Sequence, residues 1–463
     1  MLSRSHKTID RATPPPGKTP GPAVFPPFSQ HSLGNGIPLY LVENHIQPFV
    51  SLQLVIGSGA RDDGELPGLA STVCTLLLSG AGERDAEGLA ESIDFLGAEL
   101  DAGSGRDEIT VRLGVLREHL PEALDLLADV VLRPTFPAAE VARERRQSIA
   151  TLEQNESDPN YLAAVQLRRE LYSGTPYGSE IEGTRESLRK IGRRECVRFH
   201  REHFVGGDAF FVVAGDATAS ELIEMLGSRF GGWGGTRPPS VDFPESRLAP
   251  ERRVTVIDRP DALQSSFRVG RGAIARRDPD FIPLIVLNTL FGGYFNSRLN
   301  QNLREEHGYT YGARSIVETL RMPGLFSCGA SVATEVTSDA VAETLKELAR
   351  IASEPVGEEE LQMVKRYIIG SQALQTETPG QVASFVRSIA LYGLPHDYYV
   401  HFPSMVEELT SDRLLDVARR LLDPATMTII AVGNAAGIAG GLERFGPVHH
   451  VGVVPNNSLG RDE

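Results

Sequence analysis

The sequence predicts an α+β protein of two tandem homologous domains, each a mostly antiparallel sheet flanked by helices. Three observations lead to this prediction. Strand-like and helix-like hydrophobic periods follow one another along the chain, a stretch rich in glycine and proline interrupts them near the middle, and the segments after it resemble those before it. With 463 residues, the chain is long enough for about two to four domains with their own cores.

The first half contains alternating or β-branched runs that predict strands and longer amphipathic runs that predict helices. A proline-rich segment, TPPPGKTPGP, predicts an extended arm over residues 1–23. The predicted strands are IPLYLVEN (37–44), FVSLQLVIGSGARDD (49–63), SGRDEITVRLGVL (104–116) and DAFFVVAGDAT (208–218). The predicted helices are LPGLASTVCTLLLSG (66–80), RDAEGLAESIDFLGAEL (84–100), EHLPEALDLLADVVL (118–132), PAAEVARERRQSIATLEQNESDP (137–159) and SELIEMLGSRFGGW (220–233).

The stretch GGWGGTRPPSVDFPESRLAPERR (231–253) has few apolar residues and predicts an interdomain linker. The expected division is therefore an arm over 1–23, an amino-terminal α+β domain over 24–235, a linker over 236–253, a carboxy-terminal α+β domain over 254–450 and a tail over 451–463.

After the linker the chain repeats itself. QSSFRVGRGAIARRD (264–278) is similar to VSLQLVIGSGARDD (50–63), and MTIIAVGNAAGIAGGLERFGPV (427–448) is similar to FFVVAGDATASELIEMLGSRFGGW (210–233). Ser51 and Ser265 are 214 residues apart, and Phe230 and Phe445 are 215 apart. A nearly constant offset indicates a duplication, and a ligand is expected in the crevice between the two halves.

Composition excludes several classes. A net charge of −15 argues against a nucleic-acid or membrane-surface protein, because phosphates attract a basic face. No run of about eighteen apolar residues is present to span a membrane. The three cysteines are scattered, which fits a reducing compartment rather than a disulfide framework. The expected location is the cytoplasm, or the periplasm if a leader has been removed.

The stretch LREEHGYTYGARS (303–315) joins a helix-like period to an alternating one. Asn296 is the predicted N-cap of the helix, Gly308 its predicted left-handed end, and an alternating strand is expected from Tyr309 onward. Arg304 and Tyr311 could then converge on one point and hold a carbonyl oxygen that becomes an oxyanion. The structural alternative is an arginine at a helix end and a tyrosine on a sheet face.

The segment FGGYFNSRLNQNLREEHGYTYGARS resembles the second-domain motif of the pitrilysin and mitochondrial-processing-peptidase family of zinc metallopeptidases. Further similarities are the landmarks PGLA, ESDP, TPYG and FHREHF in the first half, so the resemblance covers roughly residues 30–450. It implies a clam-shell half in which Arg304 and Tyr311 bind the scissile carbonyl and stabilise the tetrahedral intermediate, opposite a zinc site.

The family's inverted zinc motif, His-x-x-Glu-His, is absent. Aligned on Gly68-Leu69-Ala70, its two histidine positions are Ser71 and Thr75, and its base position is Cys74. The distal glutamate ligand falls near Ala150 or Thr151. The resemblance therefore implies a chain that binds no metal itself. The closest imitation, HREH with His200 and His203, is expected to be structural because a metal pair needs a third ligand.

The resemblance implies the non-zinc subunit of a heterodimeric zinc metalloendopeptidase that acts on short or unfolded peptides. A homologous partner subunit would supply zinc, and this chain would be inactive alone. Two alternatives stay open: a non-catalytic scaffold subunit, and a homodimer that binds peptides without cutting them.

Overall fold

The computed structural model describes residues 24–238 and 252–452. The predicted arm, most of the predicted linker and nearly all of the predicted tail lie outside these residues. The amino-terminal domain is built on a six-stranded sheet in the order β1-β2-β8-β3-β7-β6. Its strands are β1 (Ser29–Ser32), β2 (Pro38–Glu43), β3 (Phe49–Ile56), β6 (Glu99–Ser104), β7 (Ile109–Leu116) and β8 (Ala209–Gly215).

The carboxy-terminal domain has a second six-stranded sheet in the order β11-β12-β10-β13-β9-β14. Its strands are β9 (Arg253–Asp258), β10 (Gln264–Gly272), β11 (Ala313–Val317), β12 (Leu325–Ala333), β13 (Thr428–Gly433) and β14 (Val448–Val451). The order β2-β8-β3-β7-β6 in the first sheet corresponds to β9-β13-β10-β12-β11 in the second, with the parallel pair at the same place in both. The predicted duplication and the mostly antiparallel sheets are confirmed.

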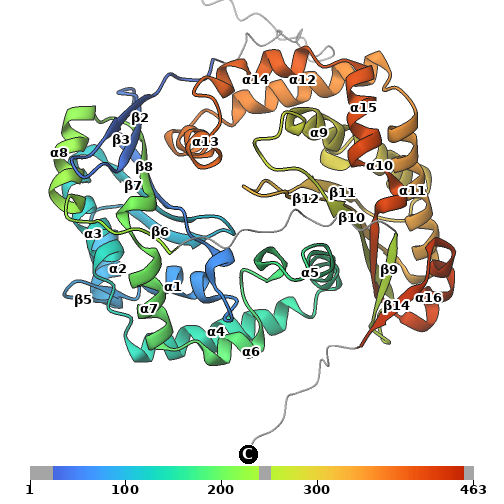
Figure 1. Cartoon of the computed structure of the whole chain (residues 1–463), viewed down its shortest axis with the longest axis horizontal. Helices are drawn as coiled ribbons and strands as arrows, with labels where there is room; N and C mark the ends of the chain where they lie inside the picture. Colours follow the sequence, from blue (N-terminus) through green and yellow to red (C-terminus); the bar gives the residue numbers. More distant parts are fainter. Residues whose placement is uncertain (1–23, 239–251, 453–463) are drawn as a thin grey trace, which may run out of the picture.

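Helices cover the outer faces of both sheets (Figure 1). On the first domain these are α1 (Leu69–Leu77), α2 (Ala86–Phe95), α3 (Leu120–Leu132) and α8 (Ala219–Phe230). Helices α4 (Ala138–Asn155) and α7 (Arg193–His203) pack on α1, and α6 (Arg185–Lys190) packs on α4. On the second they include α9 (Phe281–Asn288), α11 (Thr337–Ser353), α12 (Glu358–Leu374), α14 (Tyr398–Glu407), α15 (Ser411–Leu421) and α16 (Ala435–Leu442). The alternation of β3 explains this: Val50, Leu52 and Leu54 lie in the core, whereas Ser51 and Gln53 face the opposite side.

One helix of each domain packs on the inner face of the other domain's sheet. Helix α5 (Pro159–Leu171) packs on β10 and β13, and α13 (Pro379–Tyr392) packs on β3 and β8 (Figure 1). Both begin with a proline after a capping residue, Asp158 and Thr378. The single helix predicted over 137–159 extends to the first residue of α5. The structure corrects this, because α4 ends at Asn155 and Asp158 caps a new helix.

A buried polar contact also joins the domains. Asp107 is 1% exposed and accepts hydrogen bonds from Arg61 Nη1 at 2.9 Å, from the Tyr177 hydroxyl, and from the backbone N–H of Arg321 at 2.8 Å. Arg321 belongs to the turn between β11 and β12 of the second domain. One carboxylate thus fixes a second-domain turn against the first domain, in addition to the exchanged helices.

Candidate carbonyl-binding site and degenerate metal helix

Arg304 lies in a π-helical turn, Gln301–Glu306, that continues the short helix α10 (Arg298–Asn300). Leu299 and Leu303 anchor the turn in the core. The residue that caps the helix is Ser297, so the predicted N-cap at Asn296 is wrong by one position. Ser297 is completely buried, which fixes the entry of the chain there rather than at the preceding residue.

The end of this turn agrees with the sequence, but the following strand starts later than expected. Gly308 has φ +64°, and the Tyr309 N–H bonds back to the Leu303 carbonyl at 2.8 Å. The predicted strand from Tyr309 is wrong, because β11 begins only at Ala313. The backbone N–H of Gly312 donates a hydrogen bond to the Thr310 hydroxyl oxygen at 3.2 Å, and this local turn keeps residues 309–312 out of the sheet.

The Arg304 guanidinium lies over the ring of Phe295, with 4.5 Å between Cζ and the ring centroid. Its Nε is 3.6 Å from the Glu305 carboxylate, and its buried Nη1 has no hydrogen-bond acceptor among the described residues. Phe295 itself is 65% exposed. The Phe295 ring therefore holds the guanidinium in place, and the N–H groups of Nη1 stay available for a hydrogen bond to a ligand.

Tyr311 is 97% exposed, and within the described part of the chain its hydroxyl makes no hydrogen bond. It follows Arg304 by seven residues, on the loop that leads into β11. Tyr309, by contrast, is half-buried and its ring stacks on His307 with 4.9 Å between centroids. Tyr309 is therefore packed within the protein, whereas the exposed Tyr311 is accessible to a ligand. That Arg304 and Tyr311 hold one carbonyl stays a prediction.

The helix that would carry zinc is α1, and its residues do not fit a metal site. Ser71 and Thr75 share the outward face, and the Thr75 hydroxyl bonds to the Ser71 carbonyl at 3.2 Å. Cys74 is 1% exposed in the core, and burial raises the pKa of its thiol. In residues 24–238 and 252–452, no three His, Cys, Asp or Glu side chains form a possible metal-ligand group.

Helix α4, which the resemblance expects to supply the distal glutamate ligand, lies next to α1 but has no glutamate at the expected positions. Helix α4 packs against α1, and Ala150 and Thr151 on it are exposed. The histidines of HREH have structural partners: His200 Nε2 contacts the Val131 carbonyl at 2.8 Å, and His203 Nδ1 contacts the Ser58 hydroxyl at 3.0 Å. Both are partly buried, which lowers their pKa values.

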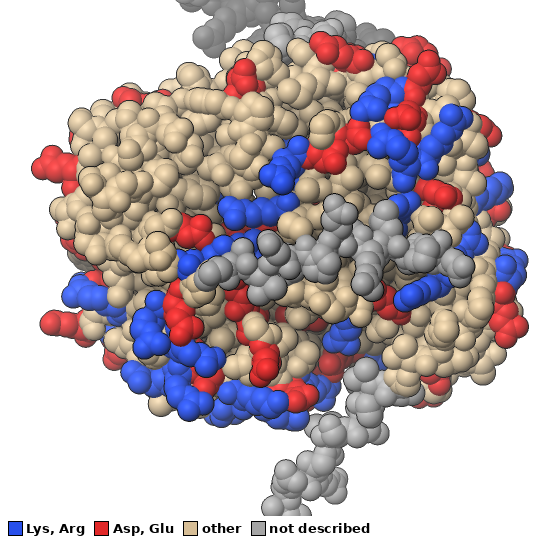
Figure 2. Space-filling model, in the orientation of Figure 1, with Lys and Arg blue, Asp and Glu red and all other residues tan. Residues whose placement is uncertain are grey.

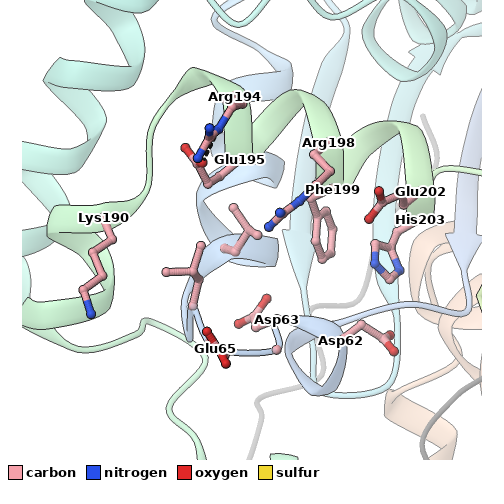
Figure 3. A pocket seen from close by; sticks show the side chains of 13 residues that line it. Asp62, Asp63, Glu65, Lys190, Arg194, Glu195, Arg198, Phe199, Glu202 and His203 are labelled. Atoms are coloured by element: carbon pink, nitrogen blue, oxygen red, sulfur yellow. Dashed lines mark hydrogen bonds and ion pairs between the residues drawn. The ribbon is translucent and has the colours of Figure 1, made fainter.

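Beside α1 the structure has a pocket of about 620 Å³ that the sequence did not indicate (Figure 3). Arg198 and Phe199 of α7 lie on one side, and Glu65 and Asp63 lie on the other. Asp63 accepts hydrogen bonds from the N–H groups of Gly68 and Ala70, both at 2.7 Å. Burial raises its pKa to about 7. The deepest acid in the pocket is thus engaged in holding the start of α1. No single stretch of sequence signals this pocket, because its walls come from segments more than a hundred residues apart.

Comparisons with known proteins agree with this architecture. The profile described as "Insulinase (Peptidase family M16)" matches residues 39–185, and that described as "Peptidase M16 inactive domain" matches residues 190–368. The chain belongs to peptidase family M16. A crystal structure titled as a peptidase M16 inactive domain from Pseudomonas fluorescens has a TM-score of 0.82 and 25% identity, over 88% of this chain and 98% of that one.

Curated relatives carry two kinds of name. An "Uncharacterized zinc protease" of Mycobacterium tuberculosis is 28% identical over 80% of this chain and 85% of its own length. A "Non-peptidase homolog" of Helicobacter pylori is 23% identical over 86% of this chain and 92% of its own length. The M16 family and the clam-shell-half fold expected from sequence are confirmed. None of the described helices has the length and apolar composition that crossing a bilayer requires.

Proposed function

We propose that this M16 chain is the non-zinc subunit of a heterodimeric metallopeptidase that cuts short or unfolded peptides. Arg304 and Tyr311 would donate hydrogen bonds to the carbonyl oxygen of the bond to be cut and stabilise the charge that develops there. Zinc would be bound by a homologous partner subunit, since Ser71, Cys74 and Thr75 offer this chain no ligand set.

The observation that carries the proposal is the contrast between the two domains. The first domain has no metal-binding side chains at these positions of α1, whereas the second has a guanidinium with an unused donor, held over Phe295, and an exposed phenol seven residues further along the chain. Burying a guanidinium nitrogen without an acceptor costs free energy. A substrate carbonyl that accepts this hydrogen bond would offset that cost.

The test is peptidase activity with a quenched unfolded peptide in zinc buffer. The chain is assayed alone and then mixed with a homologous protein that has an intact inverted zinc motif. We expect no activity alone and activity on mixing. In the complex, Arg304→Ala and Tyr311→Phe should each lower kcat by about 10²- to 10³-fold. Tyr309→Phe is the matched control, since its ring is stacked on His307, and it should keep wild-type turnover.

A non-catalytic scaffold role is the second candidate, and the relative named a non-peptidase homolog favours it. In that case the two proteins would associate without gaining activity, or Arg304→Ala and Tyr311→Phe would leave the turnover of the complex unchanged. A peptide-binding homodimer would instead bind the unfolded peptide with no partner and no metal.

A further inference from the structure

Two arginines lie in one row across the inner face of the second sheet. Arg268 on β10 and Arg314 on β11 are each paired in register with Gly329 on β12, the strand between them. Residues opposite one another in an antiparallel pair point to the same face, so both side chains leave the sheet on the side that α5 partly covers. Their backbones are two strand spacings apart, about 9.5 Å.

Gly329 lies beneath the Arg268 side chain. A Cβ atom added there would lie 2.0 Å from the Phe267 carbonyl oxygen and 3.0 Å from Cδ and Nη1 of Arg268, so the Arg268 side chain runs over this glycine toward β11. A larger residue at this position would displace the guanidinium. The glycine therefore leaves room for an arginine that crosses β12 toward the strand bearing Arg314.

Within the described residues, Arg268 and Arg314 make no ion pair and no hydrogen bond. Arg268 is half-buried, and burial lowers its pKa. The acid that acts on it is Asp158, which caps α5 and accepts the backbone N–H of Asn160 at 2.9 Å. A buried charge is ordinarily paired, because an unpaired one loses hydration without compensation; this applies to the half-buried Arg268, whereas Arg314 is exposed.

The first domain provides an internal comparison. Gln53, Arg112 and Asp101 form the corresponding row on β3, β7 and β6, since Gln53 pairs with Val212 of β8 as Arg268 pairs with Ile430 of β13. There the arginine has its carboxylate, with 2.8 Å between Arg112 Nη1 and Asp101 Oδ1.

The first-domain row lines a groove of about 420 Å³ at the start of α13. The second-domain row lies at the related start of α5, where the side-chain amide of Asn160 bonds to the Ser331 hydroxyl of β12 at 2.9 Å. The related row thus has two positive charges and no acid of its own.

We infer that the row of Arg268 and Arg314 binds a carboxylate of the peptide substrate, either its carboxy terminus or an acidic side chain. A guanidinium that crosses this glycine toward a second arginine on the next strand suits the two oxygens of a carboxylate. Arg314 follows Tyr311 by three residues, a reach of at most about 10 Å, so the carboxylate would lie within about three residues of the carbonyl that Tyr311 contacts. This inference rests on the proposed function, because it assumes that peptides lie on this face.

The test measures binding to the isolated full chain by fluorescence anisotropy. Three labelled unfolded peptides are compared: one with a free carboxy terminus, its carboxamide, and a carboxamide with glutamate near the end. We expect the plain carboxamide to bind about 10- to 100-fold more weakly than the free acid, the usual range for losing a hydrogen-bonded charge. Recovery of affinity by the glutamate peptide would assign the site to any carboxylate, and no recovery would assign it to the terminus alone.

The decisive variant is Arg268→Met, which keeps length and apolar volume but removes the charge. It should bind the free acid and the carboxamide equally, without a lower thermal midpoint, because no pairing is lost. Arg112→Met, which removes the arginine of the first-domain row, should keep the discrimination. The inference is overturned if the wild-type chain binds the acid and the amide equally, binds neither, or if Arg268→Met still discriminates.

These outcomes separate the inference from the proposed function. Dependence of turnover on Arg304 without carboxylate discrimination would refute the anion site and leave the subunit role intact. Carboxylate discrimination together with wild-type turnover of Arg304→Ala would do the reverse.

Discussion

The buried carboxylate of Asp107 offers the sharpest test of what holds the two domains together. In Asp107→Ala, Arg61 Nη1 loses its acceptor at 2.9 Å, and the N–H of Arg321 loses its acceptor at 2.8 Å. Removing one member of a buried ion pair costs about 3–5 kcal/mol, because the other charge stays buried. We therefore expect the free energy of unfolding to fall by about that amount.

The matched control is Asp101→Ala. Asp101 also pairs with an arginine from a neighbouring segment, Arg112, at 2.8 Å, but both side chains are exposed. Such a pair contributes about 0–1 kcal/mol. Urea unfolding followed by circular dichroism and tryptophan fluorescence compares the two variants, with Trp233 reporting on the first domain. If Asp107→Ala costs no more than Asp101→Ala, burial of this carboxylate does not stabilise the fold as argued.

Three further predictions follow from burial and backbone geometry. Burial raises the folded-state pKa of Asp63 from 3.8 to about 7. Its contribution to the free energy of unfolding is therefore greatest below about pH 4 and is lost as the pH rises to 7. Asp63→Asn should flatten this part of the curve of unfolding free energy against pH. Gly183→Ala should destabilise strongly, since φ is +85° and a Cβ would overlap the Pro67 carbonyl, whereas Gly174→Ala, with φ +75° and open space, should cost about 1–2 kcal/mol. The native protein should react with a thiol reagent only on unfolding, because all three cysteines are buried.

The sheets could be predicted from sequence where their strands are apolar. Strands β3, β8 and β13 are central and rich in Val, Leu, Ile or Phe, so the sequence predicts them from their hydrophobic pattern. Strand β10, with the sequence QSSFRVGRG, is less apolar, and its similarity to the β3 segment predicts it. Strand β6, with the sequence ELDAGS, was missed: it is an edge strand with no fully buried residue, and a solvated edge imposes little hydrophobic pattern.

The exchange of α5 and α13 between domains lay beyond the sequence. The apolar residues Leu162 and Leu167 show that α5 has a face to bury, but a hydrophobic face does not specify which sheet covers it. The same limit applies to Asp107, whose partners come from three separate segments. The charge pattern of the surface adds no guidance, since acidic and basic side chains are interspersed on the face in Figure 2.

The candidate site was accessible because its parts are close in sequence. Arg304 and Tyr311 are seven residues apart, so a motif captures both, and the structure adds the Phe295 ring that holds the guanidinium. The row of Arg268 and Arg314 spans 46 residues and depends on strand register. Neither residue stands out in the sequence, since an arginine in a strand is ordinarily solvated or paired. Only the register shows that both are opposite one glycine, and only the comparison with Arg112 and Asp101 shows that an acid is missing. In a duplicated fold, one domain can thus be compared with the other. Where an arginine is paired with a carboxylate in one domain and the related row of the other domain has no acid, the row without an acid is the better candidate for binding an anion.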